Sequence, residues 1–150
     1  MNEEIKKKIL TLLDEHRIMT IATLRPDGWP QATTVGYASE GLTIYFLCGL
    51  NSQKAANIAR DNRVSLTIDH DTPQVMEITG LSMAARATPV LDPVEGETVL
   101  RMLMAKYPPQ GDLPLPMPTP ADVRIFRVVP SVISALDYSK GFGHTDLVTW

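Results

Sequence analysis

The stretch that decides the fold runs from residue 17 to residue 69. It reads RIMTIATL (17–24), RPDGWP (25–30), QATTVGYA (31–38), SEGL (39–42), TIYFLCG (43–49) and, after Leu50, NSQKAANIARDNRVSLTID (51–69). The alternating, β-branched pattern of 17–24 predicts a strand, with a return strand at 30–38 and a third at 42–47. Proline and glycine in the turn at 26–28 favour a tight reversal. We therefore expect three antiparallel strands in hairpin succession.

The flanking sequence adds further short strands and helices. Apolar spacing predicts helices over 2–15, from about 52 to 60, and over 93–107, with Asn2, Asn51 or Ser52, and Asp92 as N-caps. Strands are expected at 63–69, within 74–90 with Gly80 as a bulge or close approach, at 123–129, and as a short piece after Pro130. Six or seven short strands with turn signals predict a mainly β fold, a small antiparallel barrel with helices between its strands.

Residues 108–120 contain six of the twelve prolines of the chain. Proline donates no backbone hydrogen bond, so we expect an extended connector on the surface. A proline-rich ligand for another domain is the less favoured interpretation.

Composition limits the class of protein. The 150 residues are 44% hydrophobic and 21% charged, with a net charge of −3. We expect one domain over 1–150 and no nucleic-acid partner, because a basic excess is lacking. The single cysteine, Cys48, excludes an internal disulfide. No apolar run approaches the roughly 20 residues of a membrane span, and the N-terminus does not resemble a signal peptide, so we expect a cytoplasmic protein without a membrane partner.

Side chains for difficult chemistry are scarce. The sequence has no Gly-x-Ser-x-Gly, Walker or Gly-x-Gly-x-x-Gly motif, and its three histidines are scattered. The run 69–71 (DHD) resembles a metal cluster in composition but is more typical of a solvated turn, and His16 is expected to cap or pack. We assign no metal site. An enzyme of this composition would depend on a cofactor, and a non-catalytic binding module would look the same.

One segment suggests a phosphate site. Residues 51–54 (NSQK) follow a buried strand and open a helix. Free N–H groups and the positive end of the macrodipole meet a serine hydroxyl and a lysine there. A capped helix with an exposed lysine is the simpler interpretation of the same residues.

The order of these pieces resembles the FMN-binding split β-barrel family, the pyridoxamine 5′-phosphate oxidase-like flavoproteins. Residues 123–142 (VRIFRVVPSVISALDYSKGF) also look like the closing strands of small members. The resemblance implies a six-stranded antiparallel split β-barrel with peripheral helices. It also implies a homodimer that binds FMN and a small-molecule substrate in a cleft between its two chains.

The resemblance implies specific cofactor contacts. Ser52 and Lys54 would hold the phosphate, and Gln53 stands where many members have arginine. The remaining implied cofactor-binding residues are Gln31, Ala32, Thr33 and Thr34 along the flavin ring, Cys48 and Gly49 near the phosphate, and Gln74 reaching the flavin from the next strand. A strand edge suits the polar edge of a flavin, because it offers N–H and C=O groups at regular spacing.

The implied activity is that of an FMN-dependent oxidoreductase with an unknown substrate. Two different functions fit the same residues: a flavin-binding module without turnover, or a relative that binds deazaflavin or haem in the same cleft, with His70 or His144 as the haem ligand. The tail at 141–146 (GFGHTD) lacks the arginine pair of the vitamin-producing oxidases, so their activity is not expected. We expect the tail at 139–150 to close over the flavin, with Phe142, His144 and Trp150 near the substrate.

Overall fold

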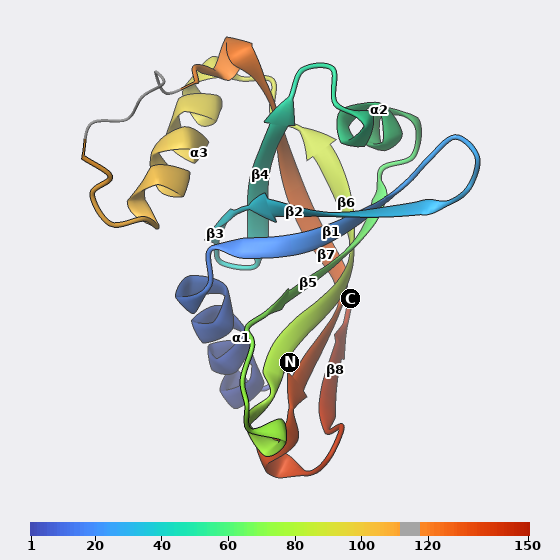
Figure 1. The fold of residues 1–150 in the computed structure, drawn as a ribbon, viewed down its shortest axis with the longest axis vertical. Coiled ribbons are helices and arrows are strands. Elements are labelled where there is room, and N and C mark those ends of the chain that lie inside the picture. Colours follow the sequence, from blue (N-terminus) through green and yellow to red (C-terminus); the bar gives the residue numbers. More distant parts are fainter. Residues whose placement is uncertain (112–117) are drawn as a thin grey trace.

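The computed structural model describes residues 1–111 and 118–150, and its strands form one antiparallel sheet that curls into a split barrel (Figure 1). The strands are β1 (Ile18–Leu24), β2 (Pro30–Gly36), β3 (Ala38–Glu40), β4 (Thr43–Gly49), β5 (Arg63–Asp69), β6 (Thr79–Pro89), β7 (Val123–Asp137) and β8 (Thr145–Thr149). Their order is β2-β1-β5-β6-β7-β4-β3, and β8 pairs with β7. The predicted mainly β class is confirmed, with eight strands in the described residues instead of six.

Three α-helices lie outside the sheet (Figure 1): α1 (Glu3–Glu15), α2 (Gln53–Arg60) and α3 (Pro93–Ala105). Short 3₁₀ turns are η1 (Val75–Glu77), η2 (Pro120–Asp122) and η3 (Tyr138–Lys140). The predicted caps are confirmed, since Asn2, Ser52 and Asp92 each accept a backbone N–H of the first helical turn. No helix within the described ranges is both long and apolar enough to span a membrane. Much of the proline-rich connector falls at 112–117, outside the described residues.

The predicted hairpin succession is correct for its first pair, and in its second pair β4 forms the hairpin with the short β3 and not with β2. β2 pairs with β1, but β3 pairs with β4, and the second neighbour of β4 is β7. The predicted strand at 30–38 is divided at Tyr37, whose side chain is fully buried and whose hydroxyl donates to the Leu13 carbonyl at 2.7 Å. This anchor separates β2 from β3, and β2 becomes a terminal strand of the sheet.

The predicted break at Pro130 is wrong, because β7 continues through it. Pro130 pairs with Ala85, whereas Val132 pairs with Ala84, so Ser131 is the extra residue of a β-bulge. A proline fits a bulge because the ladder does not need its missing N–H there. Gly80 marks a close approach, as predicted: an added Cβ would lie 3.0 Å from the Ile68 carbonyl.

The C-terminal tail contains a strand that the sequence did not predict. Residues Thr145–Thr149 form β8, which pairs with the second half of β7. Figure 1 shows β8 at the opposite end of the sheet from α2. Within its own chain the tail therefore completes the sheet and does not cover the predicted cofactor site.

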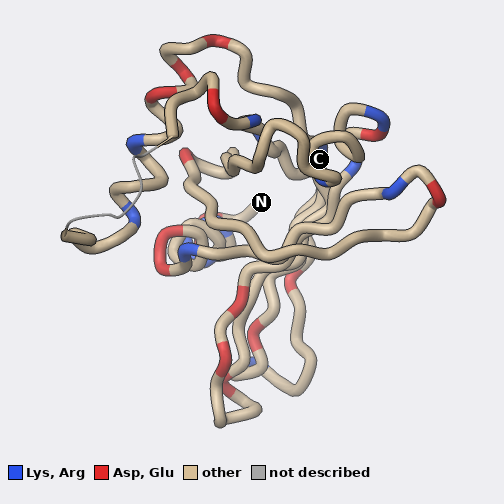
Figure 2. Tube along the Cα trace, turned by 45° about the horizontal axis from the view of Figure 1, so that its top comes forward, with Lys and Arg blue, Asp and Glu red and all other residues tan. Residues whose placement is uncertain are grey.

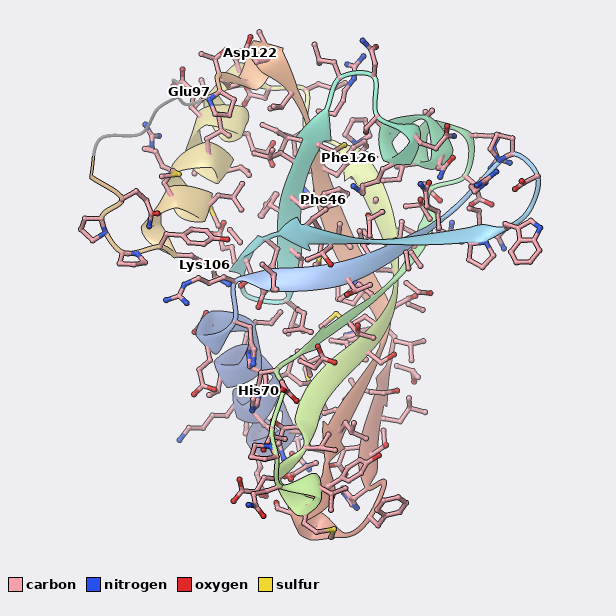
Figure 3. The ribbon with its side chains drawn as sticks, in the orientation of Figure 1. Phe46, His70, Glu97, Lys106, Asp122 and Phe126 are labelled. Atoms are coloured by element: carbon pink, nitrogen blue, oxygen red, sulfur yellow. The ribbon has the colours of Figure 1, made fainter. Side chains whose placement is uncertain are left out.

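The core lies on the concave side of the sheet. Alternate residues of β1, β5 and β6 point into it, together with Ile9, Leu12 and Leu13 of α1. Phe46 and Phe126 stack with ring centroids 5.3 Å apart beneath α2 (Figure 3). A second cluster packs Val99 and Leu103 of α3 against β3 and β4.

Lys106, at the end of α3, ties this helix to α1. Its ammonium donates to the carbonyls of Leu13 (2.8 Å) and His16 (2.6 Å) and lies 3.8 Å from the centre of the Tyr37 ring (Figure 3). Burial lowers the pKa of Lys106 to about 8. The lysine satisfies carbonyls that the last turn of α1 leaves without helical partners.

Candidate functional site

The start of α2 is built to attract an anion. The Ser52 hydroxyl accepts from the Ala55 N–H at 3.1 Å, and the backbone N–H groups of Gln53 and Lys54 have no acceptor among the described residues. These two groups and the helix macrodipole give this end a partial positive charge. The predicted geometry of residues 51–54 is therefore present.

Lys54 and Arg124 are the available cations beside α2 in the described part of the chain, and Arg124 lines the cavity that Ser52 also borders. Three other arginines near α2 have internal partners: Arg25 pairs with Asp27, Arg60 donates to the Leu24 carbonyl, and Arg63 pairs with Asp61 at 2.7 Å. The Arg63 guanidinium holds the pKa of the Asp61 carboxyl well below its usual range. Lys54 is half-buried and has no ion-pair partner in the described part of the chain.

A buried amide network joins α2 to two strands. Asn57 of α2 is fully buried, and its side chain donates to the Thr23 hydroxyl on β1 (3.0 Å) and to the Gln31 carboxamide oxygen on β2 (3.1 Å). Its own oxygen accepts from the Gln53 side chain at 2.8 Å. The network therefore brings together Gln31 and Gln53, two predicted site residues that lie in different elements.

Sequence reasoning missed Asn57 and Thr23. The available signal was one amide among small apolar residues on the buried side of a short helix, between Ala55 and Ile58. A buried amide requires hydrogen-bond partners, but the sequence does not show where they lie.

β2 presents the predicted ring-binding residues on two faces. Gln31 and Thr33 are half-buried, whereas Ala32 and Thr34 are exposed on the outer face. The Thr33 hydroxyl is buried and has no hydrogen-bond partner among the residues described. Buried polar atoms are normally satisfied, so this oxygen fits a position completed by a ligand or a second chain. β2 is a terminal strand, and its free side offers backbone groups as well.

The remaining predicted residues contribute less within a single chain. The Cys48 side chain is buried in the core, which leaves only its backbone near α2, and Gly49 is the exposed last residue of β4. Gln74 is exposed in the loop before η1, not on a strand as predicted. Figure 1 shows η1 at the end of the sheet opposite α2, so one chain does not bring Gln74 to the rest of the site.

A cavity of about 730 Å³ borders the far side of α2. It is lined by Asn51 and Ser52, by apolar residues including Leu50, Leu91 and Phe126, and by Arg124. Its lining includes no residue of β2. The start of α2 thus borders this cavity, but the described residues of one chain do not enclose it together with β2.

The sequence profile of the pyridoxamine 5′-phosphate oxidase family matches residues 5–137. The chain belongs to this family. It is 30% identical over 69 residues to general stress protein 26 of Bacillus subtilis (strain 168); this match covers 46% of the chain and about half, 49%, of that relative.

Two solved structures extend the comparison along the chain. A conserved hypothetical protein, Rv2991, from Mycobacterium tuberculosis is 27% identical with a TM-score of 0.78, covering 97% of this chain and 91% of that one. An F420 reductase is 27% identical with a TM-score of 0.66, covering 83% and 94%. The resemblance to this split-barrel family is confirmed.

Proposed function

We propose that the chain binds FMN in a cleft between two copies of itself and acts as an FMN-dependent oxidoreductase on a small molecule. The observation that carries the proposal is the junction of α2 with β2. Within the described residues it combines an anion-attracting helix end, an unpaired lysine and an edge strand with an unsatisfied hydroxyl. Family membership supports the same assignment.

The residues present fit the two ends of such a cofactor. The Lys54 ammonium and the N–H groups of Gln53 and Lys54 would bind the phosphate by charge-assisted hydrogen bonds. Thr33 and the free backbone of β2 would hold and orient the ring. When bound, the flavin would supply two-electron redox chemistry that the side chains of the protein lack.

A second copy would bind the outer face of the sheet. Its outward residues form two cross-strand rows, one of Thr34, Thr20, Thr67, Ser82, Ser134 and Leu147, and one of Ala32, Ala22, Ser65, Ala84, Val132 and Thr149. We call these two rows the outer face. These two rows contain no charged residue, a feature of interface centres, and the exposed Arg63, Arg86 and Asp69 lie in the rows that border them.

The outer face is continuous with the candidate site, because Ala32 and Thr34 belong to both. Figure 2 shows the β1–β2 hairpin without charged residues except at its turn. Because the two rows carry no charge, two copies of the chain can bind through them about a twofold axis without electrostatic repulsion. The remote Gln74 would then act only at the site of the partner.

Lys54→Ala should weaken FMN binding by about 1–3 kcal/mol, roughly 5- to 150-fold in Kd, because it removes a charge-assisted hydrogen bond. Gln53→Arg should have the opposite effect, since it adds a cation beside the phosphate. Quenching of FMN fluorescence measures both. Lys7→Ala, on the exposed face of α1, is the matched control. Equal affinity of Lys54→Ala and the unmodified protein would place the phosphate elsewhere.

F420 is the second candidate cofactor, because a solved relative is named as an F420 reductase. A deazaflavin with an acidic tail needs a basic groove, and Arg124 is the one basic residue among those that line the cavity beside α2. Offering FMN and F420 separately to cofactor-free protein, with absorption spectra as the readout, distinguishes the two. Tighter binding of F420 would overturn the FMN assignment.

Haem binding and a flavin-binding role without turnover are less well supported by the site. His70 hydrogen-bonds His16 beyond the end of β5, and His144, directly before β8, lies 3.3 Å from Asp146; within the described part of the chain neither histidine hydrogen-bonds a residue of α2 or lines the cavity beside it. Neither histidine of the same chain can therefore serve as a haem ligand at the α2–β2 junction. FMN binding without reduction by any nicotinamide donor or amine tested would favour the non-catalytic module.

A further inference from the structure

Two histidines that are far apart in the sequence meet at the lower half of the sheet. His16 follows α1, and His70 follows β5 and lies beside α1 (Figure 3). His16 Nε2 and His70 Nδ1 are 3.1 Å apart, and their ring centroids are 5.2 Å apart. His16 is half-buried and His70 is exposed, so solvent reaches the pair.

The helix end fixes the tautomer of His16. Its Nδ1 lies 2.8 Å from the Leu12 carbonyl, one of the last carbonyls of α1. A carbonyl only accepts hydrogen bonds, so Nδ1 carries the proton and Nε2 of the neutral ring presents a lone pair to His70. Backbone carbonyls orient metal-binding histidines in the same way.

We propose that His16 and His70 form a binding site for a divalent transition-metal ion of the Zn²⁺ class. Two imidazole nitrogens on a tetrahedral zinc, each about 2.0–2.1 Å from the ion, lie roughly 3.3 Å apart, close to the spacing seen here. The metal takes the place of the proton on His70 Nδ1, and the His70 ring carries its proton on Nε2 instead, as the other neutral tautomer. A small swing of the exposed His70 ring aims both lone pairs at the ion.

The surroundings of the pair carry both charge signs: Arg17 follows His16, and the Lys106 ammonium donates to the His16 carbonyl, whereas three carboxylates lie close in sequence. Glu15 precedes His16, and Asp69 and Asp71 flank His70; all three carboxylates are exposed. No third His, Cys, Asp or Glu completes a cluster of three ligands within the described residues, so water fills the remaining positions. The site is therefore open and its affinity is below that of a closed structural zinc site.

The site does not depend on the proposed cofactor, because it lies at the end of β5 and not at α2. The sequence does not show that the two histidines are close, because His16 is 54 positions from His70. Residues 69–71 alone are indistinguishable from a solvated turn.

Titration calorimetry of the full-length, chelator-treated protein with ZnCl₂ at neutral pH tests the proposal. We expect one Zn²⁺ per chain and a loss of affinity in His70→Ala at least as large as the roughly 10–100-fold that removal of an outer-shell partner costs. His144→Ala is the matched control and should bind like the unmodified protein. His70→Ala should keep its FMN affinity, which separates this test from that of the proposed function.

A second measurement distinguishes loss of the metal site from a folding defect in the variant. Zn²⁺ should raise the melting temperature of the unmodified protein and of His144→Ala, but not of His70→Ala. No stoichiometric binding, or binding that survives in His70→Ala, would overturn the site.

Discussion

Ser82→Arg should convert a dimer into monomers that no longer hold FMN. Ser82 lies in the middle of the outer face, paired with Thr67 on one side and Ser134 on the other. Its side chain is exposed in the single chain, so an arginine fits the monomer without disturbing the core. In a twofold dimer the substitution places two unpaired guanidinium groups at the buried centre of the contact.

Like charges facing each other across an interface cost several kcal/mol, which corresponds to more than about 100-fold in the dimer dissociation constant. Light scattering and sedimentation measure the change in mass, and FMN fluorescence measures the loss of the cofactor in the same samples. Glu97→Arg, on the exposed side of α3, introduces the same residue away from the outer face (Figure 3). A Ser82→Arg protein that remains dimeric would show that another surface forms the contact.

The local elements were predictable because their signals are local. The caps of α1, α2 and α3, the period-two burial of β5 and the turn at Gly28 all depend on residues within a few positions of one another. The continuity of β7 through Pro130 was not predictable in this way. It depends on a bulge whose partner, Ala85, lies on another strand.

The candidate site also has a part that the sequence predicts and a part that it does not. The start of α2 with Ser52 as its N-cap follows from residues 51–54 and is present in the structure, whereas anion binding there stays a prediction. The joining of α2 to β2 depends on Asn57, whose three partners lie on α2, β1 and β2. Only the folded chain shows that Gln31 and Gln53 bind the same amide. The faces of β2 were also hidden, because a strand pattern alone does not say which side meets a cofactor.

Asn57→Leu should therefore lower the free energy of unfolding by about 2–4 kcal/mol and weaken FMN binding. Leucine is close to asparagine in size, so the loss comes from polar groups left without partners and not from a cavity. Thr23 is only 2% exposed, and its hydroxyl would lose its donor, at a cost of about 1–3 kcal/mol. Gln31 and Gln53 would be freed from their fixed positions near the start of α2, and the proposed cofactor would have to order them on binding.

Adding Thr23→Val to Asn57→Leu tests whether the lost stability comes from the unpaired Thr23 hydroxyl or from altered packing. In the double variant with Asn57→Leu both members of the Thr23–Asn57 pair become apolar, and replacing both partners of a buried hydrogen bond is nearly neutral. The double variant should thus be more stable than Asn57→Leu alone, whereas FMN affinity should stay low because Gln31 and Gln53 remain free. Urea unfolding followed by circular dichroism gives the stabilities, with Gln53→Leu as the comparison that removes the donor to the Asn57 oxygen but leaves the two hydrogen bonds that Asn57 donates. An Asn57→Leu protein as stable as the unmodified chain would show that the network does not hold α2 against the sheet.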